Sequence, residues 1–214
     1  MNPEEIVILA DGDFPASAAA LQILEQADMV VCCDRAADTL AATGREADLI
    51  VGDLDSLSPA LRERFAGRLR HDCDQESNDL TKAFHAAMEY RPGRIRILGA
   101  TGRREDHTLA NISLLADYQK EAGGACRIDM ISDYGRFEAA CGERTFCSIP
   151  GQEISIFAFD RELRITSTGL QYPTGHVVFD TLWKASLNKA EGESFTLAPG
   201  NDSMYLVYFC NPGL

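Results

Sequence analysis

Two acidic residues separated by one position follow a short apolar run. In the segment VGDLDSL (51–57), Asp53 and Asp55 come after Val51 and Gly52. If the backbone stays extended, side chains two residues apart point to the same face. Carboxylate oxygens suit Mg²⁺, which binds one or two carboxylates together with waters and substrate phosphates. The spacing therefore predicts a magnesium site, and the alternative is a solvated turn whose Asp and Ser side chains bind local N–H groups.

A second polar segment marks the start of a predicted helix. In DQESNDLTKAF (74–84), Asn78 is suited to cap the helix, and Asp79 and Lys82 lie three residues apart on one helical face. Asp79 would complete a carboxylate cluster with the two acids of the first segment, and Lys82 would approach a phosphate as a point charge. The alternative is a capped helix that carries a surface ion pair.

A third segment, ILGATGRREDHTLANISLL (97–115), combines glycines with cations. Gly99 and Gly102 would let the backbone approach a phosphate, and the start of the following helix favours an anion. The guanidinium groups of Arg103 and Arg104 are suited to bind phosphate oxygens through paired N–H donors. The segment predicts a phosphate-binding loop, and the alternative is a plain strand-to-helix turn.

Two more acids and a histidine belong to the same predicted edge. Asp106 and His107 lie at the helix start of the third segment, and Asp34 follows another apolar run at 29–33. An acid is favourable near a helix N-terminus whether or not a ligand binds there. For His107, a general-base role and a structural packing role both stay open.

Strands and helices that alternate along the first two-thirds of the chain must position these residues. Short apolar runs predict strands at 6–10, 29–33, 48–53, 94–100 and 127–132. The spacing of apolar residues predicts helices at 16–26, at 59–65, at 79–90 and around Leu109, Ile112, Leu115 and Ala116. This alternation predicts an α/β domain with a mostly parallel, doubly wound sheet that binds ligands beyond the carboxyl ends of its strands.

After about Asp133 the helical spacing nearly disappears, and short β-rich segments follow. Alternating apolar residues such as Ile154 and Ile156 predict a C-terminal antiparallel β-sandwich domain. We therefore expect two domains, at residues 1–135 and 136–214.

The charge balance limits the possible partners. The 214 residues carry 20 basic and 33 acidic side chains, a formal net charge of −13. A chain this acidic, without a cluster of cations, repels nucleic acid and anionic membranes. No apolar run reaches the length of a membrane span, and the acidic start does not resemble a secretory signal, so we expect a cytoplasmic protein.

The cysteines are odd in number and lack metal-site spacing. Seven are present, with no Cys-x-x-Cys pair, which argues against a disulfide framework and a zinc site. We expect most of them to be buried as small hydrophobic side chains.

Taken in order, these segments resemble the thiamine pyrophosphokinase family. The resembling segments are ILADGDFP, CDRAADTL, VGDLDSL, QESNDLTKAF and LGATGRREDHTLANISLL, followed by PGQEISIFAF, GLQYP and ASLN. Their collinear order covers nearly the whole chain. The resemblance implies a catalytic α/β domain that binds ATP and Mg²⁺, a β-sandwich domain that helps to bind thiamine, and a homodimer with active sites between the subunits.

The resemblance also implies roles for individual residues. It implies that Asp53, Asp55 and Asp79 hold Mg²⁺, and that these acids act in catalysis together with Lys82 and Arg104. Contacts to ATP are expected for Asp34, Gln75, Gly99, Gly102, Arg104, Asp106 and His107. Contacts to thiamine are expected for Trp183, Ser186 and Asn188.

Three positions depart from the family pattern. Arg35 stands where a glycine usually follows the acid of the second strand, and Arg103 stands where a second glycine is usual. Asn78 replaces a threonine. The acidic residues of the pattern are all present.

The implied reaction transfers the β,γ-diphosphate of ATP to the hydroxyl group of thiamine, which yields thiamine diphosphate and AMP. One alternative is a related diphosphotransferase that acts on another heteroaromatic alcohol, such as a hydroxymethylpterin. Another is a non-catalytic sensor of nucleotide or thiamine, for which the substitutions at Arg35 and Arg103 are the sequence indication.

Overall fold

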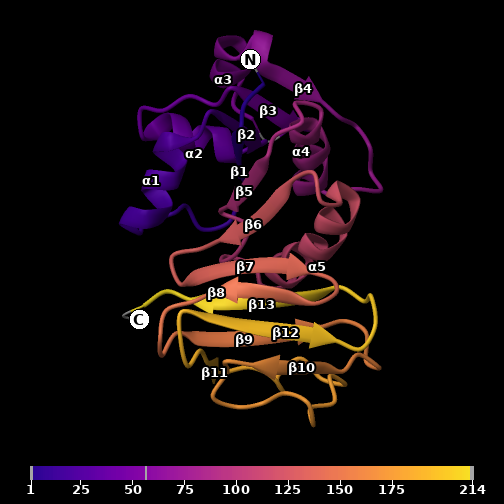
Figure 1. Cartoon of the computed structure of the whole chain (residues 1–214). Coiled ribbons are helices and arrows are strands. Elements are labelled where there is room, and N and C mark those ends of the chain that lie inside the picture. The colour runs from indigo at the N-terminus through magenta and orange to yellow at the C-terminus, as the bar shows by residue number, and fades with distance from the viewer. Residues whose placement is uncertain (1, 56, 213–214) are drawn as a thin grey trace. The chain divides into compact units, whose positions relative to one another are not determined.

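The structure is a computed structural model that describes residues 2–55 and 57–212 (Figure 1). Its contacts divide the chain into two units, Met1–Asp133 (unit 1) and Tyr134–Leu214 (unit 2). The sequence predicted a boundary two residues later. Ser56, the serine of the VGDLDSL segment, lies outside the described residues.

Unit 1 is an α/β unit built on a parallel sheet. Its strands are β1 (Glu5–Leu9), β2 (Met29–Cys33), β3 (Leu49–Gly52), β4 (Leu69–His71), β5 (Arg94–Leu98) and β6 (Arg127–Ile131). Their order in the sheet is β6-β5-β1-β2-β3-β4, and each neighbouring pair is parallel. The chain runs outward from β1 in one direction and then returns to β5 on the other side of β1. This reversal creates a switch point between β1 and β5, where ligands bind in sheets of this kind.

Helices cover both faces of this sheet. They are α1 (Ala18–Gln26), α2 (Ala36–Ala42), α3 (Pro59–Arg64), α4 (Asp79–Met88) and α5 (Glu105–Ala122), with a short 3-10 helix η1 (Ala66–Arg68). Helices α1 and α2 pack on one face, and α4 packs against β1, β2 and β3 (Figure 1). None of the helices in the described part of the chain is both long and apolar enough to cross a membrane.

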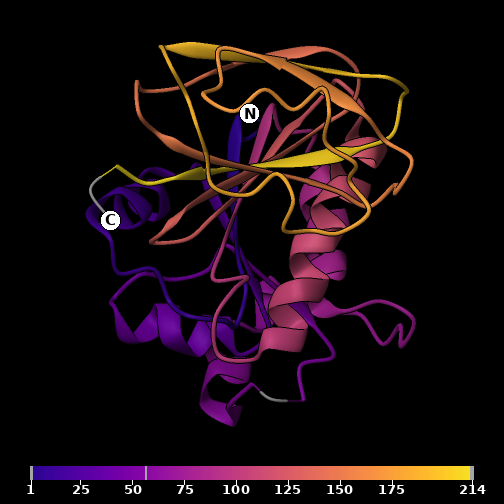
Figure 2. The same ribbon diagram turned by 90° about the horizontal axis from the view of Figure 1, so that it is seen from below.

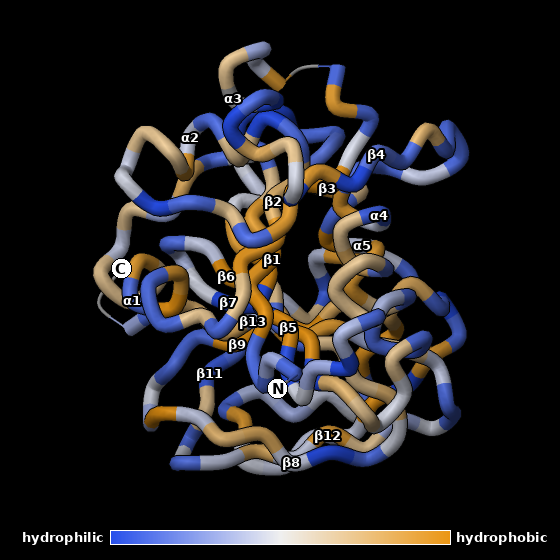
Figure 3. The backbone as a smooth tube through the Cα atoms, turned by 90° about the horizontal axis from the view of Figure 1, so that it is seen from above, coloured by the Kyte–Doolittle hydropathy of each residue, from blue (hydrophilic) through white to orange (hydrophobic). Residues whose placement is uncertain are grey.

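The core of unit 1 explains why the strands read as continuous apolar runs. Side chains from both faces of β1, β2 and β3 are fully buried, including Ile6, Val7, Val31 and Ile50. Figure 3 shows these strands in the hydrophobic colours, while the helices around them mix hydrophobic and hydrophilic colours. A sheet buried on both faces needs apolar residues at every position, so the runs do not alternate.

Helix α2 and strand β4 of unit 1 were not predicted, and neither was the short 3-10 helix η1. Helix α2 begins at Ala36, and its N-cap residue Arg35 makes no side-chain capping hydrogen bond, so the usual start signal is missing. Strand β4 has three residues, of which Leu69 alone is apolar. Both elements are too short and too weakly marked for periodicity to reveal them.

Unit 2 is an antiparallel β-sandwich, as expected. Its strands are β7 (Gly135–Ala140), β8 (Arg144–Cys147), β9 (Glu153–Ala158), β10 (Ile165–Thr168), β11 (Asn188–Lys189), β12 (Ser194–Pro199) and β13 (Tyr205–Cys210). Strands β11, β9, β13 and β7 form one layer in that order, and β10, β12 and β8 form the other. In Figure 2 the last two strands, both yellow, lie at different levels.

Aromatic side chains fill the space between these two layers. Phe209 of β13 lies on one side, and Phe146 of β8 and Phe195 of β12 lie on the other, with ring centroids 5.3 to 5.9 Å apart. Aromatic pairs at such separations are favourable beyond their buried area. The alternation read from the sequence corresponds to one buried and one outer face in β9 and β12, whereas consecutive residues of β13 are buried.

The cysteines differ in part from expectation. All seven are free, consistent with the absence of a disulfide framework, but the expectation that most are buried is wrong. Cys32, Cys33 and Cys126 are buried, whereas Cys73, Cys141 and Cys147 are exposed and Cys210 is intermediate. The buried ones lie in or beside apolar strands, and the others lie in loops or near strand ends.

Replacing Phe84 tests the packing of α4 in unit 1. The ring is fully buried and stacks on Tyr118 of α5, with centroids 4.3 Å apart. We expect Phe84→Ala to lower the free energy of unfolding by about 3–5 kcal/mol, because it leaves a cavity between the two helices. Urea unfolding followed by helical circular dichroism measures this change. The control Leu109→Ala, at a residue of α5 that is 59% exposed, should change it by no more than about 0.5 kcal/mol.

Candidate functional site

Two loops meet at the switch point of the sheet. Backbone hydrogen bonds join the loop after β1 to the end of β5 and its following loop: Ala10 N to Leu98 O (2.9 Å), Gly12 N to Gly99 O (2.6 Å) and Asp13 N to Thr101 O (2.8 Å). These bonds satisfy backbone groups that strand pairing no longer serves. These hydrogen bonds therefore hold the two loops together at this edge of the sheet.

Glycines are required where these loops touch. A Cβ atom at Gly12 would overlap the carbonyl oxygens of Gly99 and Thr101, and one at Gly102 would overlap the Asp13 carboxylate. Gly102 also has a φ of +82°, a conformation that favours glycine. The sequence singled out Gly99 and Gly102 for close approach to a ligand, and the approach that the structure shows is between the two loops themselves.

Three carboxylates gather beyond the ends of β2 and β3. Asp34, Asp53 and Asp55 each offer an oxygen within 4.8 Å of the others. Leu54 between the last two has a φ of +63°, so the backbone does not continue as the extended strand that the spacing argument assumed. Instead it turns, and Asp55 N donates a hydrogen bond to Asp53 Oδ1 (3.2 Å). The carboxylates meet because of this turn.

Asp79 lies beside this cluster at the start of α4. A side chain at Gly52 would lie 3.0 Å from Asp34 Cβ and 3.5 Å from Asp79 Oδ1, so both acids flank the end of β3. Asn78 caps the helix, with its Oδ1 accepting a hydrogen bond from Thr81 N (2.9 Å). The cap fixes where α4 begins and therefore where the Asp79 carboxylate lies.

The acids perturb one another. Repulsion from Asp53 is the main cause that raises the pKa of Asp55. Burial raises the pKa of Asp79, Asp53 and Asp34 add to the effect, and Lys82 opposes it. Like charges this close favour proton or cation uptake, and carboxylate oxygens are ligands that Mg²⁺ accepts. The donor set therefore fits a divalent cation.

Lys82 is a buried cation one turn into α4. Only 5% of the residue is exposed, and its Nζ lies 3.5 Å from Asp79 Oδ1. A buried ammonium group needs a nearby negative charge, and Asp79 supplies it. In this structure Lys82 therefore contacts the acidic cluster through its ion pair with Asp79.

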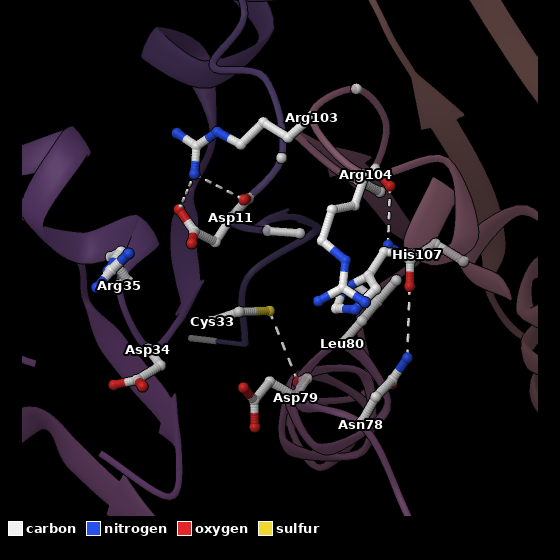
Figure 4. A pocket seen from close by; sticks show the side chains of 15 residues that line it. Asp11, Cys33, Asp34, Arg35, Asn78, Asp79, Leu80, Arg103, Arg104 and His107 are labelled. Atoms are coloured by element: carbon white, nitrogen blue, oxygen red, sulfur yellow. Dashed lines mark hydrogen bonds and ion pairs between the residues drawn. The ribbon is translucent and has the colours of Figure 1, made fainter. Parts of the chain in front are cut away.

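A cavity of about 450 Å³ opens beside these acids. Figure 4 shows its side chains converging from the ends of β1 and β2, the start of α4 and the loop before α5. The lining residues are Ala10, Asp11, Gly12, Cys33, Asp34, Arg35, Asn78, Asp79, Leu80, Ala100, Gly102, Arg103, Arg104, His107 and Asn111. This volume is within the range of small-ligand sites.

Consecutive arginines contribute two cations to the cavity wall. Arg103 has a φ of +57° and donates from Nη1 to the backbone oxygen (3.0 Å) and to Oδ1 (2.8 Å) of Asp11. Arg104 pairs with Asp106, with Nη2 and Oδ2 2.6 Å apart. This pairing lowers the pKa of Asp106 to about 2 and raises the pKa of Arg104.

The structure brings many of the predicted ATP and catalytic residues together. Five of the predicted residues line the cavity, namely Asp34, Asp79, Gly102, Arg104 and His107. Five more are connected to it by contacts described above, namely Asp53 and Asp55 through the cluster, Lys82 through Asp79, Asp106 through Arg104, and Gly99 through the joined loops. Gln75 is not among the lining residues, and its exposed side chain donates to Cys73 O (3.4 Å).

The predicted thiamine residues lie in unit 2. Trp183 is 70% exposed, and its carbonyl oxygen accepts a hydrogen bond from Ser186 Oγ (2.6 Å). The buried amide of Asn188 accepts from Tyr172 N (3.0 Å) and donates to Tyr172 O (2.7 Å), which fixes strand β11 to the preceding segment. Asn188 is therefore a structural residue of this unit, while the Trp183 ring is open to a ligand or partner.

Asp11 and Asn111 line the cavity and were not selected from the sequence as site residues. Asp11 follows β1, and its position at a strand end was the available signal. Asn111 lies four residues after His107 on α5, a spacing that puts both on one helical face. Its Nδ2 donates to Ala100 O (2.8 Å), and its Oδ1 accepts from Asn78 Nδ2 (3.4 Å), so it connects α4, α5 and the glycine loop.

The fold and the cavity together define a class of protein: an α/β unit with a cavity lined by acids and arginines at the carboxyl ends of its strands, followed by a β-sandwich unit. Comparison with protein families is more specific. The family model for the catalytic domain of thiamin pyrophosphokinase matches residues 20–126, and the model for its substrate-binding domain matches residues 135–208. The chain belongs to the thiamin pyrophosphokinase family.

Individual relatives agree with this family. Thiamine pyrophosphokinase 1 of Oryza sativa is 31% identical over 96 residues, and thiamine pyrophosphokinase of Bacillus subtilis is 40% identical over 68 residues. These alignments cover 40% and 30% of this chain, and they span 34% and 32% of the two relatives, about a third of each.

Solved structures show the same fold over nearly the whole chain. The B. subtilis thiamine pyrophosphokinase structure has a TM-score of 0.78 at 23% identity and covers 97% of this chain and 99% of its own. The yeast structure has a TM-score of 0.73 at 15% identity, with 98% and 87% covered.

Replacing Gly12 tests how closely the two switch-point loops approach. We expect Gly12→Ala to lower the free energy of unfolding of unit 1 by about 1–3 kcal/mol, because the added methyl group forces the loops apart. Urea unfolding followed by helical circular dichroism gives the value. At Gly124 an added Cβ meets nothing within 4 Å, so Gly124→Ala serves as the control and should leave the midpoint almost unchanged.

The ion pair between Arg104 and Asp106 predicts a lowered pKa for the Asp106 carboxyl group, which can be measured. The folded pKa of Asp106 is about 2 against an ordinary 3.8, so the pair stabilises the folded chain above pH 3.8, and this contribution is lost as the pH falls through about 2. We expect carboxyl-carbon NMR to give a midpoint near 2 for Asp106 in the wild type. In Arg104→Gln the midpoint should rise toward 3.8, and an unchanged midpoint would show that Arg104 is not the cause.

Proposed function

We propose that this chain transfers the β,γ-diphosphate of ATP to the hydroxyl group of thiamine, which yields thiamine diphosphate and AMP. The observation that carries the proposal is the carboxylate cluster of Asp34, Asp53 and Asp55 beside a cavity with an arginine wall, in a chain of this family. A polyphosphate needs both a divalent cation and fixed positive charge, and this arrangement offers a place for each.

Mg²⁺ would be held by Asp53, Asp55 and Asp79, and the structure adds Asp34 to these acids. When bound, the ion neutralises charge on phosphate oxygens and supports the leaving group. The raised pKa of Asp55 and of Asp79 reflects charge repulsion and burial that a bound cation would relieve.

The remaining task of the protein is positioning. The thiamine oxygen attacks the β-phosphorus, a new O–P bond forms, and the bond to the oxygen that AMP retains breaks. Arg104 would contact the polyphosphate from the cavity wall, and His107 would contact the nucleotide beside it. Lys82 opposes the rise that burial causes in the pKa of Asp79, and its Nζ contacts that carboxylate from inside α4. The hydroxyl proton passes to a carboxylate of the site or to solvent.

Thiamine binding is proposed for unit 2. Thiamine is cationic, and a chain with a net charge of −13 attracts cations. The exposed Trp183 ring is available to stack on a heteroaromatic ring, Ser186 lies three residues further along the chain, and Asn188 keeps this segment in place. A substrate panel that includes a hydroxymethylpterin distinguishes thiamine from another heteroaromatic alcohol.

A homodimer with active sites between the subunits is part of the same proposal. Unit 2 exposes large apolar side chains in one stretch of sequence, with Tyr172, Leu182, Trp183 and Leu187 between 44% and 71% exposed. Exposed apolar residues that gather on one surface favour a partner protein or a ligand. A location in the cytoplasm stays a prediction from the sequence.

Replacing Asp55 tests the metal role. We expect Asp55→Asn to reduce AMP and thiamine diphosphate formation from ATP, Mg²⁺ and thiamine by about 100-fold or more, because a ligand of the charge-neutralising ion is lost. In metal-free protein the same variant should melt at a higher temperature than the wild type, because repulsion with Asp53 is removed. Its melting temperature should no longer rise when Mg²⁺ is added.

The control for this experiment is Asp117→Asn, the same chemical change at an exposed position of α5. It should leave both activity and the response to Mg²⁺ unchanged. Activity of Asp55→Asn within a few-fold of the wild type contradicts the metal role. Binding of ATP and thiamine by the wild type, without any turnover at saturating Mg²⁺, contradicts the enzyme and favours a sensor.

A further inference from the structure

Arg103 combines a strained backbone with a position at the cavity wall. Its φ of +57° lies in the left-handed region, which an arginine adopts at a cost. Strained residues of this kind persist where the surroundings fix them, and they cluster at ligand sites. The two consecutive arginine side chains point in different directions (Figure 4).

The two arginine side chains meet different partners. Arg103 reaches across to Asp11 after β1, and Arg104 pairs with Asp106 on its own segment. Both arginines nevertheless line the same cavity. In Figure 4 Arg103 lies at the upper end beside Asp11, Arg104 extends from that end toward the middle, and Asp34 and Asp79 lie at the lower end. A polyanion bound beside the acids would therefore have two guanidinium groups at the opposite end.

The contact with Asp11 orients the Arg103 guanidinium without using all of its donors. Nη1 alone makes both contacts to Asp11, at 3.0 and 2.8 Å. Among the described residues, Nε and Nη2 of Arg103 have no hydrogen-bonded partner. A guanidinium group binds phosphate best through two parallel N–H donors, and these remain available.

The ion pair between Arg103 and Asp11 is also weak enough for a ligand to replace it. The side chains of Arg103 and Asp11 are 48% and 35% exposed, so solvent screens their attraction. An incoming phosphate can share or replace the carboxylate at little cost. Asp11 thus holds the guanidinium at the wall before a ligand arrives.

We propose that Arg103 is a specificity-determining residue that binds the β- and γ-phosphates of the nucleotide, and that Asp11 is its positioning residue. The proposal rests on the proposed function, since it takes ATP as the ligand of this cavity. The Arg103 side chain adds a contact to the two phosphates that are transferred. This contact makes the cavity bind a nucleoside triphosphate more selectively than a monophosphate.

Calorimetric titration of the full chain tests the proposal. The probes are Mg²⁺ with an ATP analogue whose α–β bridging oxygen is replaced by a methylene group, and AMP as the ligand without transferred phosphates. We expect Arg103→Gln to weaken binding of the analogue about 10-fold or more and to change AMP binding little, because charged hydrogen bonds to the missing phosphates are lost. Arg103→Lys should recover part of the affinity, since it keeps the charge without the paired donors.

The positioning role of Asp11 has its own readout. Asp11→Asn should weaken binding of the analogue in the wild-type background and have no further effect in Arg103→Gln, because Asp11 acts through that arginine. An additive loss in the double variant would overturn this role. A matched control is Arg91→Gln, because Arg91 is another exposed arginine with a positive φ (+53°) and does not line the cavity.

Two results would overturn the role of Arg103 itself. One is wild-type affinity of Arg103→Gln for the analogue, and the other is an equal loss for the analogue and AMP. Arg103→Gly, which relieves the backbone strain, keeps the test valid if the glutamine variant is poorly folded, and it should show the same selective loss. The proposed function is judged separately by AMP release with thiamine, so a chain that binds the analogue selectively and yet releases no AMP contradicts that function alone.

Discussion

Three carboxylates held within 4.8 Å of one another repel, and the structure of unit 1 has to offset that repulsion. The buried strands β2 and β3 and the capped helix α4 fix the backbone beside Asp34 and Asp79, whereas Asp53 and Asp55 lie on the turn that follows β3. The raised pKa of Asp55 records the remaining repulsion. A bound cation would relieve this repulsion, and it would thereby link the stability of the fold to binding of the ion.

The cations of the site are placed by a different constraint. The loops after β1 and β5 share backbone hydrogen bonds and pack without room for side chains at Gly12 and Gly102. The close packing fixes the short segment that carries Arg103 and Arg104. The acids therefore follow β2 and β3 or begin α4, the arginines follow β5, and the cavity beside the switch point is lined by residues of both groups.

Much of the fold followed from local patterns, because apolar runs and helical spacing are strong where elements are long and buried. Strand β2 was predicted with its observed bounds, whereas α2 and β4 were missed because they are short and carry weak signals. In the site, the acids were recognised by residue type and spacing. Asp11 and Asn111 were not, because their roles depend on partners distant in the sequence, such as Arg103 and Ala100.

The sequence by itself determined the two-part fold class, the family resemblance and the residue types that could hold Mg²⁺ and phosphate. Local chemistry carries that information, since hydrophobic periodicity and motif order are properties of a linear chain. Only the tertiary structure decided that Asp34 joins Asp53 and Asp55, that a left-handed turn at Leu54 brings the last two together, and that Arg103 reaches Asp11. These contacts depend on which strand ends are neighbours in the sheet and on the φ angles of individual residues such as Leu54 and Arg103.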